Sequence, residues 1–278
     1  MRHGATDMGT GCDTILSQMA ADILGTDLNN VVPFGVDTDI SPYDSGSYAS
    51  STTYITGKAV AKAAENLREK IVKMGASMLE AEPNEVTFDG KCVEKKDKSA
   101  KVTLPEIGVR GTFGNNDALQ VTENCAAEIS PPPYMVGMAE VEIDKETGSV
   151  ELIDYVAVVD CGTPINPNLA RVQTEGGIAQ GIGMALFEDI QYTEKGAMAN
   201  NSLMQYKIPS RLDVGKIRVE FKPSYEKSHP FGAKSIGEIV IDTPCPAIVN
   251  AVYNAVGVRV EEMPIKPEKI AMELLDEK

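Results

Sequence analysis

A single carboxylate in the segment GAKSIGEIVIDTPCPAIVNAVYNAVG, residues 232–257, is the first candidate for chemistry. Glu238 directly follows Gly237 and stands before an apolar run that has the composition of a helix. A glycine lets the backbone pass close to a bound molecule, and a helix behind it determines where the carboxylate points. Such a carboxylate can serve as a general base, although most glutamates are solvated loop residues. Lys234, earlier in the same loop, is either an anion contact or a surface charge.

A glycine-rich turn near the N-terminus is the second candidate. In DMGTGCDT, residues 7–14, Gly9 and Gly11 flank Thr10 directly before a predicted helix. Backbone N–H groups in such a turn can approach an anion, and the helix dipole favours negative charge there. The segment matches neither the P-loop nor the full dinucleotide-binding pattern, so a turn that only caps its helix is the alternative.

Hydroxyl groups gather in the segment GSYASSTT, residues 46–53, again just before a long helix. Rows of hydroxyl groups suit the edges of a phosphate or a pterin. A run of Ser and Thr before a helix is also a common helix cap, which is the alternative reading. The candidate residues are Ala49, Ser50, Ser51 and Thr52.

Gln173 lies in RVQTEGGIAQGIG, a predicted helix whose other side chains are largely absent or small. Its amide offers two donors and an acceptor, so it can hydrogen-bond a heterocycle. The alternative is an ordinary exposed helix residue.

Composition limits the classes of function. With 278 residues the chain can form one large domain or two moderate ones. A net charge of −15 repels a phosphate backbone and argues against nucleic-acid binding. No apolar run approaches the roughly 20 residues of a membrane helix, and the start lacks a signal peptide, so we expect no membrane partner. Five scattered cysteines without a CxxC pair indicate reduced thiols in the cytoplasm, and two isolated histidines predict no protein ligands for a metal.

These candidates need elements that position them, and hydrophobic periodicity predicts both helices and strands. Helices are expected over residues 12–25, 57–80, 166–188, 245–257 and 267–275. Strands are expected at the start of residues 31–56, at 85–90, at 100–104 and as a hairpin over 138–160. The triple proline at 131–133 is the best candidate boundary. The predicted fold is α+β, with one mixed α/β lobe over residues 1–130 and a second over 131–278.

The order of the motifs is more specific than any one of them. DMGTGCDTILSQMAADILG, DTDISPYDSGSYASSTTYITGKAV, VVDCGTPINPNLARVQTEGGIAQGIGMALFE and GAKSIGE follow one another along the chain. Together they closely resemble the C-terminal half of the molybdopterin-binding subunit of the xanthine dehydrogenase and aldehyde oxidase family. The resemblance runs from about residue 4 to residue 270 and is weakest over residues 81–130.

The resemblance implies roles for individual residues. Glu238 matches the catalytic glutamate of the family's Gly-Glu motif, and Thr10 stands where many members have Gln. GEIV replaces the frequent GEPP, which leaves the backbone after Glu238 less rigid. The residues expected to bind the cofactor are Gly9, Thr10, Gly11, Ala49, Ser50, Ser51, Thr52, Gln173, Lys234 and Gly237.

The resemblance also implies an activity and its partners. Members hydroxylate an electron-poor carbon of an aromatic heterocycle or aldehyde, with water as the oxygen donor. The cofactor would be the molybdenum cofactor, a molybdopterin, and the resemblance is compatible with its cytosine dinucleotide form. The chain shows no motif for 2Fe-2S or FAD, so these belong on partner chains. Relatives have an N-terminal half that forms the other wall of the pocket, so we expect this chain to be inactive without that half.

Two other hypotheses remain. The chain could be a non-catalytic module that binds or assembles the molybdenum cofactor, although the retained Glu238 argues against a storage role. It could instead be a nucleotide-binding enzyme that uses DMGTG and SYASSTT as phosphate loops.

Overall fold

The structure is a computed structural model that describes residues 1–114, 118–126 and 128–276. The chain divides into two compact units. Unit 1 comprises Met1–Pro131 and Glu226–Lys234, and unit 2 comprises Pro132–Tyr225 and Ser235–Lys278. Both units mix helices and sheet, so the predicted α+β class is confirmed. The segment Glu226–Lys234 belongs to unit 1, although it lies within the stretch assigned to the second lobe from the sequence.

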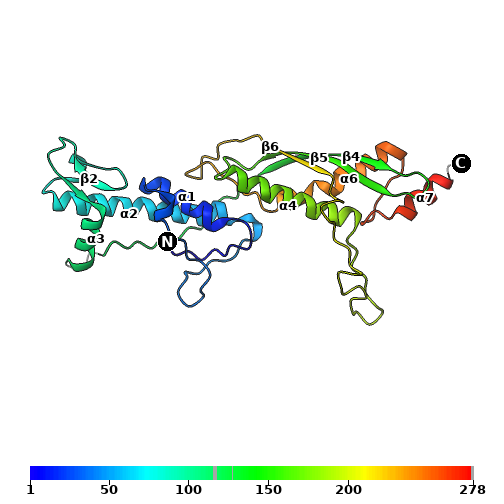
Figure 1. The fold of residues 1–278 in the computed structure, drawn as a ribbon, viewed down its shortest axis with the longest axis horizontal. Coiled ribbons are helices and arrows are strands. Elements are labelled where there is room, and N and C mark those ends of the chain that lie inside the picture. The colour runs from blue at the N-terminus through cyan, green and yellow to red at the C-terminus, as the bar shows by residue number, and fades with distance from the viewer. Residues whose placement is uncertain (115–117, 127, 277–278) are drawn as a thin grey trace. The chain divides into compact units, whose positions relative to one another are not determined.

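Unit 1 is built on two packed helices and a small sheet. Its main elements are α1 (Cys12–Leu24), α2 (Gly57–Met78), β1 (Val86–Phe88), β2 (Cys92–Lys95), β3 (Lys101–Thr103) and α3 (Leu104–Phe113). The three strands form an antiparallel sheet in the order β1-β2-β3. In Figure 1, α1 and α2 lie side by side, in agreement with their many contacts.

Helix α2 meets the small sheet through residues on one face. Ile71 and Met74 are buried there, as the helical spacing of apolar residues requires. Gly75 lies so close to Val93 of β2 that an added Cβ would stand 2.7 Å from the Cβ of that valine. The glycine therefore allows the sheet to pack directly onto the helix.

Unit 2 is a three-stranded sheet with helices on one face. Its elements are β4 (Tyr134–Ile143), β5 (Val150–Asp160), α4 (Pro167–Leu186), β6 (Lys216–Phe221), α5 (Ile239–Asp242), α6 (Pro244–Val256) and α7 (Pro267–Asp276). β4 pairs antiparallel with β5, and β5 pairs parallel with β6. Alternate residues of β5, from Tyr155 to Val159, are buried in one core with Ile178 of α4 and Ile248 of α6. Figure 1 shows α4 running along this sheet.

The structure differs from the predicted elements in four places. Among the described residues, no strand forms at the start of residues 31–56, where one was expected. Pro33 lacks an N–H donor, and an isolated bridge joins Phe34 to Arg2. Strand β2, helix α3 and strand β6 were not predicted. β2 and β6 are short, and each is stabilised by pairing with another strand rather than by its own pattern.

The prediction that no apolar run approaches the length of a membrane helix is corrected for one segment. Residues 239–256 form an 18-residue stretch that is long and apolar enough, by composition, to cross a membrane. In the structure Thr243 separates this stretch into α5 and α6. Ile248 and Val252 of α6 are fully buried in the core of unit 2, and 22% of the whole stretch is buried.

Candidate functional site

The Gly9-Thr10-Gly11 turn closes around the carboxylate of Asp7. Asp7 Oδ1 accepts hydrogen bonds from the N–H groups of Gly9 (2.9 Å) and Gly11 (3.1 Å). Its Oδ2 accepts from the N–H of Asp13 at 3.3 Å. Burial raises the pKa of Asp7, but these N–H groups outweigh it and hold the pKa below its usual value.

Asp7 therefore occupies the backbone donors that the sequence suggested for an anion. In this conformation the N–H groups of Gly9 and Gly11 donate to Asp7, and cofactor binding by these two glycines stays a prediction. Gly9 has a φ of +106°, and an added Cβ would meet no atom within 4 Å, so one side of the turn is open. A contact between Thr10 and the cofactor likewise stays a prediction.

The hydroxyl-rich segment contains two successive residues with left-handed backbone. Ala49 has a φ of 54° and Ser50 a φ of 53°. Non-glycine residues in this region cost on the order of 1 kcal/mol each, and such strain gathers at functional sites. The hydroxyl of Ser51 donates to the carbonyl of Gly46 (3.0 Å), and that of Thr52 to a neighbouring serine hydroxyl (3.1 Å). These two hydroxyls therefore hold the loop in shape.

The helix that follows this loop begins without a side-chain cap. A π-helical turn, Thr52–Thr56, runs directly into α2. Within the described chain, neither Ser51 nor Thr56 places a side chain on the N–H groups at these two helix starts. At the start of α2 the Gly57 N–H already bonds to the Thr52 and Tyr54 carbonyls, so the start at Thr52 is the one where the helix dipole can favour an anion. Binding of a phosphate group at this start stays a prediction.

A buried histidine, not identified from the sequence, supports the same loop. His229 is 1% exposed and packs against the ring of Tyr54. Its Nδ1 accepts from the N–H of Phe231 (3.2 Å), so Nε2 carries the proton and donates to the carbonyl of Thr53 (3.2 Å). Ser228 shares a 2.6 Å hydrogen bond with the Tyr54 hydroxyl. Burial lowers the pKa of His229 to about 4, so the ring is neutral at pH 7 and acts as a structural bracket.

The structure places the predicted site residues in two groups. Unit 1 contains Gly9, Thr10, Gly11, Ala49, Ser50, Ser51, Thr52 and Lys234. Unit 2 contains Gln173, Gly237 and Glu238. Convergence of the two groups on one cofactor remains a prediction.

Glu238 is the N-cap residue of the one-turn helix α5, which packs against α4. Its carbonyl accepts from the N–H of Ile241 (3.2 Å), and its side chain is exposed. On α4, an added Cβ at Gly177 would overlap the side chain of Val240. The close packing expected for this glycine-rich helix therefore exists, and its partner is α5 together with the start of α6.

Gln173 lies toward the same end of this helix pair. The contacts advance in step, from Gly177 against Val240 to Gly181 against Pro244. One helical turn before Gly177, on the same face of α4, is Gln173, which is half-buried. If the same spacing of contacts continues one turn back along both segments, Gln173 pairs with the residues just before Glu238. Both residues belong to unit 2, and the meeting of the Gln173 amide with the Glu238 carboxylate stays a prediction.

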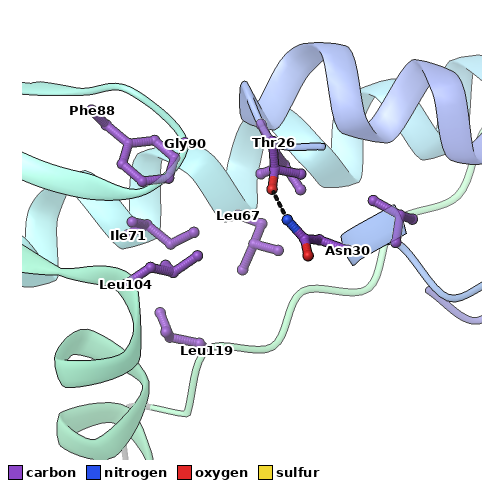
Figure 2. Close-up of a pocket in the computed structure, with 10 residues that line it drawn as sticks. Thr26, Asn30, Leu67, Ile71, Phe88, Gly90, Leu104 and Leu119 are labelled. Carbon is purple, nitrogen blue, oxygen red and sulfur yellow. Dashed lines mark hydrogen bonds between the residues drawn. The ribbon is translucent and has the colours of Figure 1, made fainter. Parts of the chain in front are cut away.

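Unit 1 contains a cavity whose described lining includes none of the predicted site residues (Figure 2). Its volume is about 260 Å³, and its walls come from the α2 face, the small sheet and α3. The polar side chains at its edge bond to each other, with Asn30 donating to the Thr26 hydroxyl at 3.1 Å. The remaining lining residues are Leu24, Val31, Leu67, Ile71, Phe88, Gly90, Leu104 and Leu119. None of the lining residues in the described part of the chain has a titratable side chain, so these residues offer no group for acid–base chemistry.

Comparison with known proteins identifies the family. A family model described as a molybdopterin cofactor-binding domain matches residues 1–215. The chain belongs to this family. The resemblance inferred from the four ordered motifs is confirmed, and so is its consequence that the cofactor concerned is a molybdenum cofactor.

Relatives of this molybdopterin cofactor-binding domain are much longer proteins. The chain is 37% identical over 274 residues to the probable hypoxanthine oxidase XdhD of Escherichia coli K12, covering 97% of the chain and 28% of the relative. It is 30% identical over 276 residues to the putative xanthine dehydrogenase molybdenum-binding subunit XdhA of the same strain, covering 97% and 37%. The chain thus spans about a third of the length of these relatives.

Solved structures agree. Quinoline 2-oxidoreductase from Pseudomonas putida 86 has a TM-score of 0.82 and 30% identity, covering 98% of this chain and 36% of that one. Aldehyde oxidoreductase from Desulfovibrio gigas has a TM-score of 0.75 and 25% identity, covering 96% and 28%. The molybdopterin cofactor-binding domain described here therefore has the fold of part of these larger chains.

Proposed function

We propose that this chain forms part of the cofactor site of a molybdenum hydroxylase. The reaction would hydroxylate an electron-poor carbon of an aromatic heterocycle or an aldehyde, with oxygen taken from water. The similarity of 98% of the chain to a quinoline 2-oxidoreductase, at a TM-score of 0.82, carries this proposal. Relatives named as a probable hypoxanthine oxidase and a nicotine 6-hydroxylase large subunit support a heterocyclic substrate class.

The chain offers groups that fit a molybdopterin. The uncapped helix start at Thr52 can receive a phosphate, and the left-handed residues before it turn the loop toward that start. The amide of Gln173 can hydrogen-bond a pterin edge, and Lys234 can add positive charge. When bound, the cofactor supplies a molybdenum centre that accepts the two electrons removed from the substrate.

Glu238 is the proposed general base. Its carboxylate lies at the start of a fixed helical turn, is exposed, and is preceded by a glycine. In that position it can remove a proton from the attacking oxygen as the oxygen bonds to the substrate carbon. A positioned base contributes about 10²- to 10⁴-fold to a rate.

The complete enzyme would need further polypeptides. Among the relatives is a subunit of the 6-hydroxypseudooxynicotine dehydrogenase complex, so members of this group work in hetero-oligomers. We propose that the remaining part of the molybdopterin-binding subunit and chains that carry 2Fe-2S and FAD complete the enzyme, in the cytoplasm. The chain alone would then not turn over substrate.

The test replaces Glu238 by Gln in the enzyme assembled with its native partners. Glu238→Gln should lower kcat at least about 100-fold while molybdenum content stays unchanged. Glu262→Gln, at an exposed position of the same unit, is the matched control and should retain wild-type turnover. Turnover near wild type in Glu238→Gln would remove Glu238 from the mechanism. Tight cofactor binding by the chain alone, with no dye reduction by the complex, would favour the non-catalytic module instead.

A further inference from the structure

A buried hydroxyl pair links the sheet of unit 2 to the junction between α5 and α6. The side chain of Tyr155, on β5, is fully buried, and its hydroxyl donates to Thr243 Oγ1 at 2.8 Å. Thr243 is the residue at which α5 ends and α6 begins, so it terminates the turn that Glu238 starts. Burial raises the pKa of Tyr155, which keeps the hydroxyl protonated as a donor.

The neighbouring strand leaves space for this pair. An added Cβ at Gly137, on β4, would overlap the hydroxyl oxygen of Tyr155 and stand 2.9 Å from Thr243 Oγ1. A glycine at this position therefore allows the tyrosine hydroxyl to reach Thr243. The hydrogen bond spans 88 residues of sequence, so local helix formation does not supply it.

The turn of α5 also packs against α4. Val240 is fully buried against Gly177, where the missing Cβ allows the two backbones to approach. α5 is a single turn of four residues, and the N–H of Ile241 donates to the Glu238 carbonyl at 3.2 Å. One helical turn is unstable in isolation, so its geometry depends on these two external contacts.

We propose that Tyr155 and Thr243 are positioning residues that fix the direction of the Glu238 carboxylate. This inference rests on the proposed role of Glu238. The packed contact with α4 prevents α5 from moving toward or away from that helix, and the Tyr155–Thr243 hydrogen bond fixes the end of the turn. Neither residue touches substrate in this scheme. Their effect is transmitted through the backbone, because a displacement of about 1 Å at a catalytic group can cost on the order of 100-fold in rate.

The first test measures the turn directly in the purified chain. Hydrogen–deuterium exchange of a peptide covering residues 236–246 should be at least tenfold faster in Tyr155→Phe and in Thr243→Val. Thr243→Ser keeps the acceptor hydroxyl and should exchange within twofold of wild type. Exchange over residues 267–275, in α7 of the same unit, is the internal reference and should not change. Equal acceleration in both peptides would show a general loss of stability and would overturn the positioning role.

The second test measures kinetics in the assembled enzyme. Tyr155→Phe and Thr243→Val should each lower kcat about tenfold, with KM within twofold, and Thr243→Ser should restore kcat. The kcat of the double variant should be no lower than that of the less active single variant, because the two substitutions remove the same hydrogen bond. Unchanged kcat and unchanged exchange in Tyr155→Phe would overturn the inference. If Glu238→Gln is inactive in that same enzyme, only the positioning role fails; if Glu238→Gln is active, the proposed base fails first.

Discussion

Acidification should destabilise unit 1 by titrating His229. The ring is fully enclosed, and its Nδ1 accepts from the N–H of Phe231, so protonation would place a proton where the structure needs an acceptor. Burial lowers the pKa of His229 to about 4 in the folded chain, and the neighbouring ammonium group of Lys58 acts in the same direction. In the unfolded chain a histidine titrates near 6.5. The unfolded state therefore binds more protons between these two pH values, and stability falls as the pH falls through that window.

The size of the effect follows from the two pKa values. A difference between about 6.5 and about 4 corresponds to about 3 kcal/mol when the window has been crossed completely. Between pH 7.5 and pH 5 the loss should be about 2 kcal/mol, because the folded ring is still mostly neutral at pH 5. Carboxylates contribute little in this interval, since most of them titrate below it.

Urea unfolding of wild type and His229→Gln at about pH 7.5, 6 and 5 measures this loss. Wild type should lose about 2 kcal/mol more than the variant over the interval. The chain has only two histidines, so a proton NMR titration with His3→Gln as the assignment variant gives the folded pKa directly. Parallel pH profiles for wild type and His229→Gln, or a His229 midpoint near 6.5, would refute the reasoning.

Two further predictions concern unit 2 packing and thiol reactivity. Gly176→Ala should stabilise the chain by about 0.5–1 kcal/mol, because nothing lies within 4 Å of its added Cβ, whereas Gly177→Ala should destabilise it by about 1–3 kcal/mol through overlap with Val240. Equal urea midpoints for the two variants would contradict the packing described for α4. Burial raises the pKa of the Cys12 thiol to about 11, so native chain treated with iodoacetamide at pH 8 should be modified at Cys12 at least about 100-fold more slowly than at the half-buried Cys125. Comparable modification rates at Cys12 and Cys125, measured by peptide mass spectrometry, would show that the reagent reaches the start of α1.

Much of the fold could be predicted because local periodicity reports burial. The apolar spacing of α1 and α2 and the alternation across β4 and β5 each indicate one buried face, and the structure has these elements within a few residues of the predicted bounds. Short strands such as β6 have weak patterns of their own. β6 exists because β5 supplies its hydrogen-bond partners, and that pairing joins distant parts of the chain.

The candidate site also has features that the sequence could predict and features that only the structure shows. Residue types and motif order were enough to identify the family, and they singled out Glu238, Gln173 and the hydroxyl-rich segment. They gave no indication that the side chain of Asp7 accepts hydrogen bonds from the N–H groups of Gly9 and Gly11. Only the tertiary structure reveals that Asp7 takes these N–H groups, because this depends on the conformation of its side chain.

The amino-acid sequence by itself determined which groups are available for chemistry, since side-chain type and local spacing are enough to establish that. The tertiary structure decided how those groups are held. His229 reaches the carbonyl of Thr53 across 176 residues, and Tyr155 reaches Thr243 across 88. No local pattern encodes such hydrogen bonds, because they form only when packing brings distant segments together and excludes water from the donor and the acceptor.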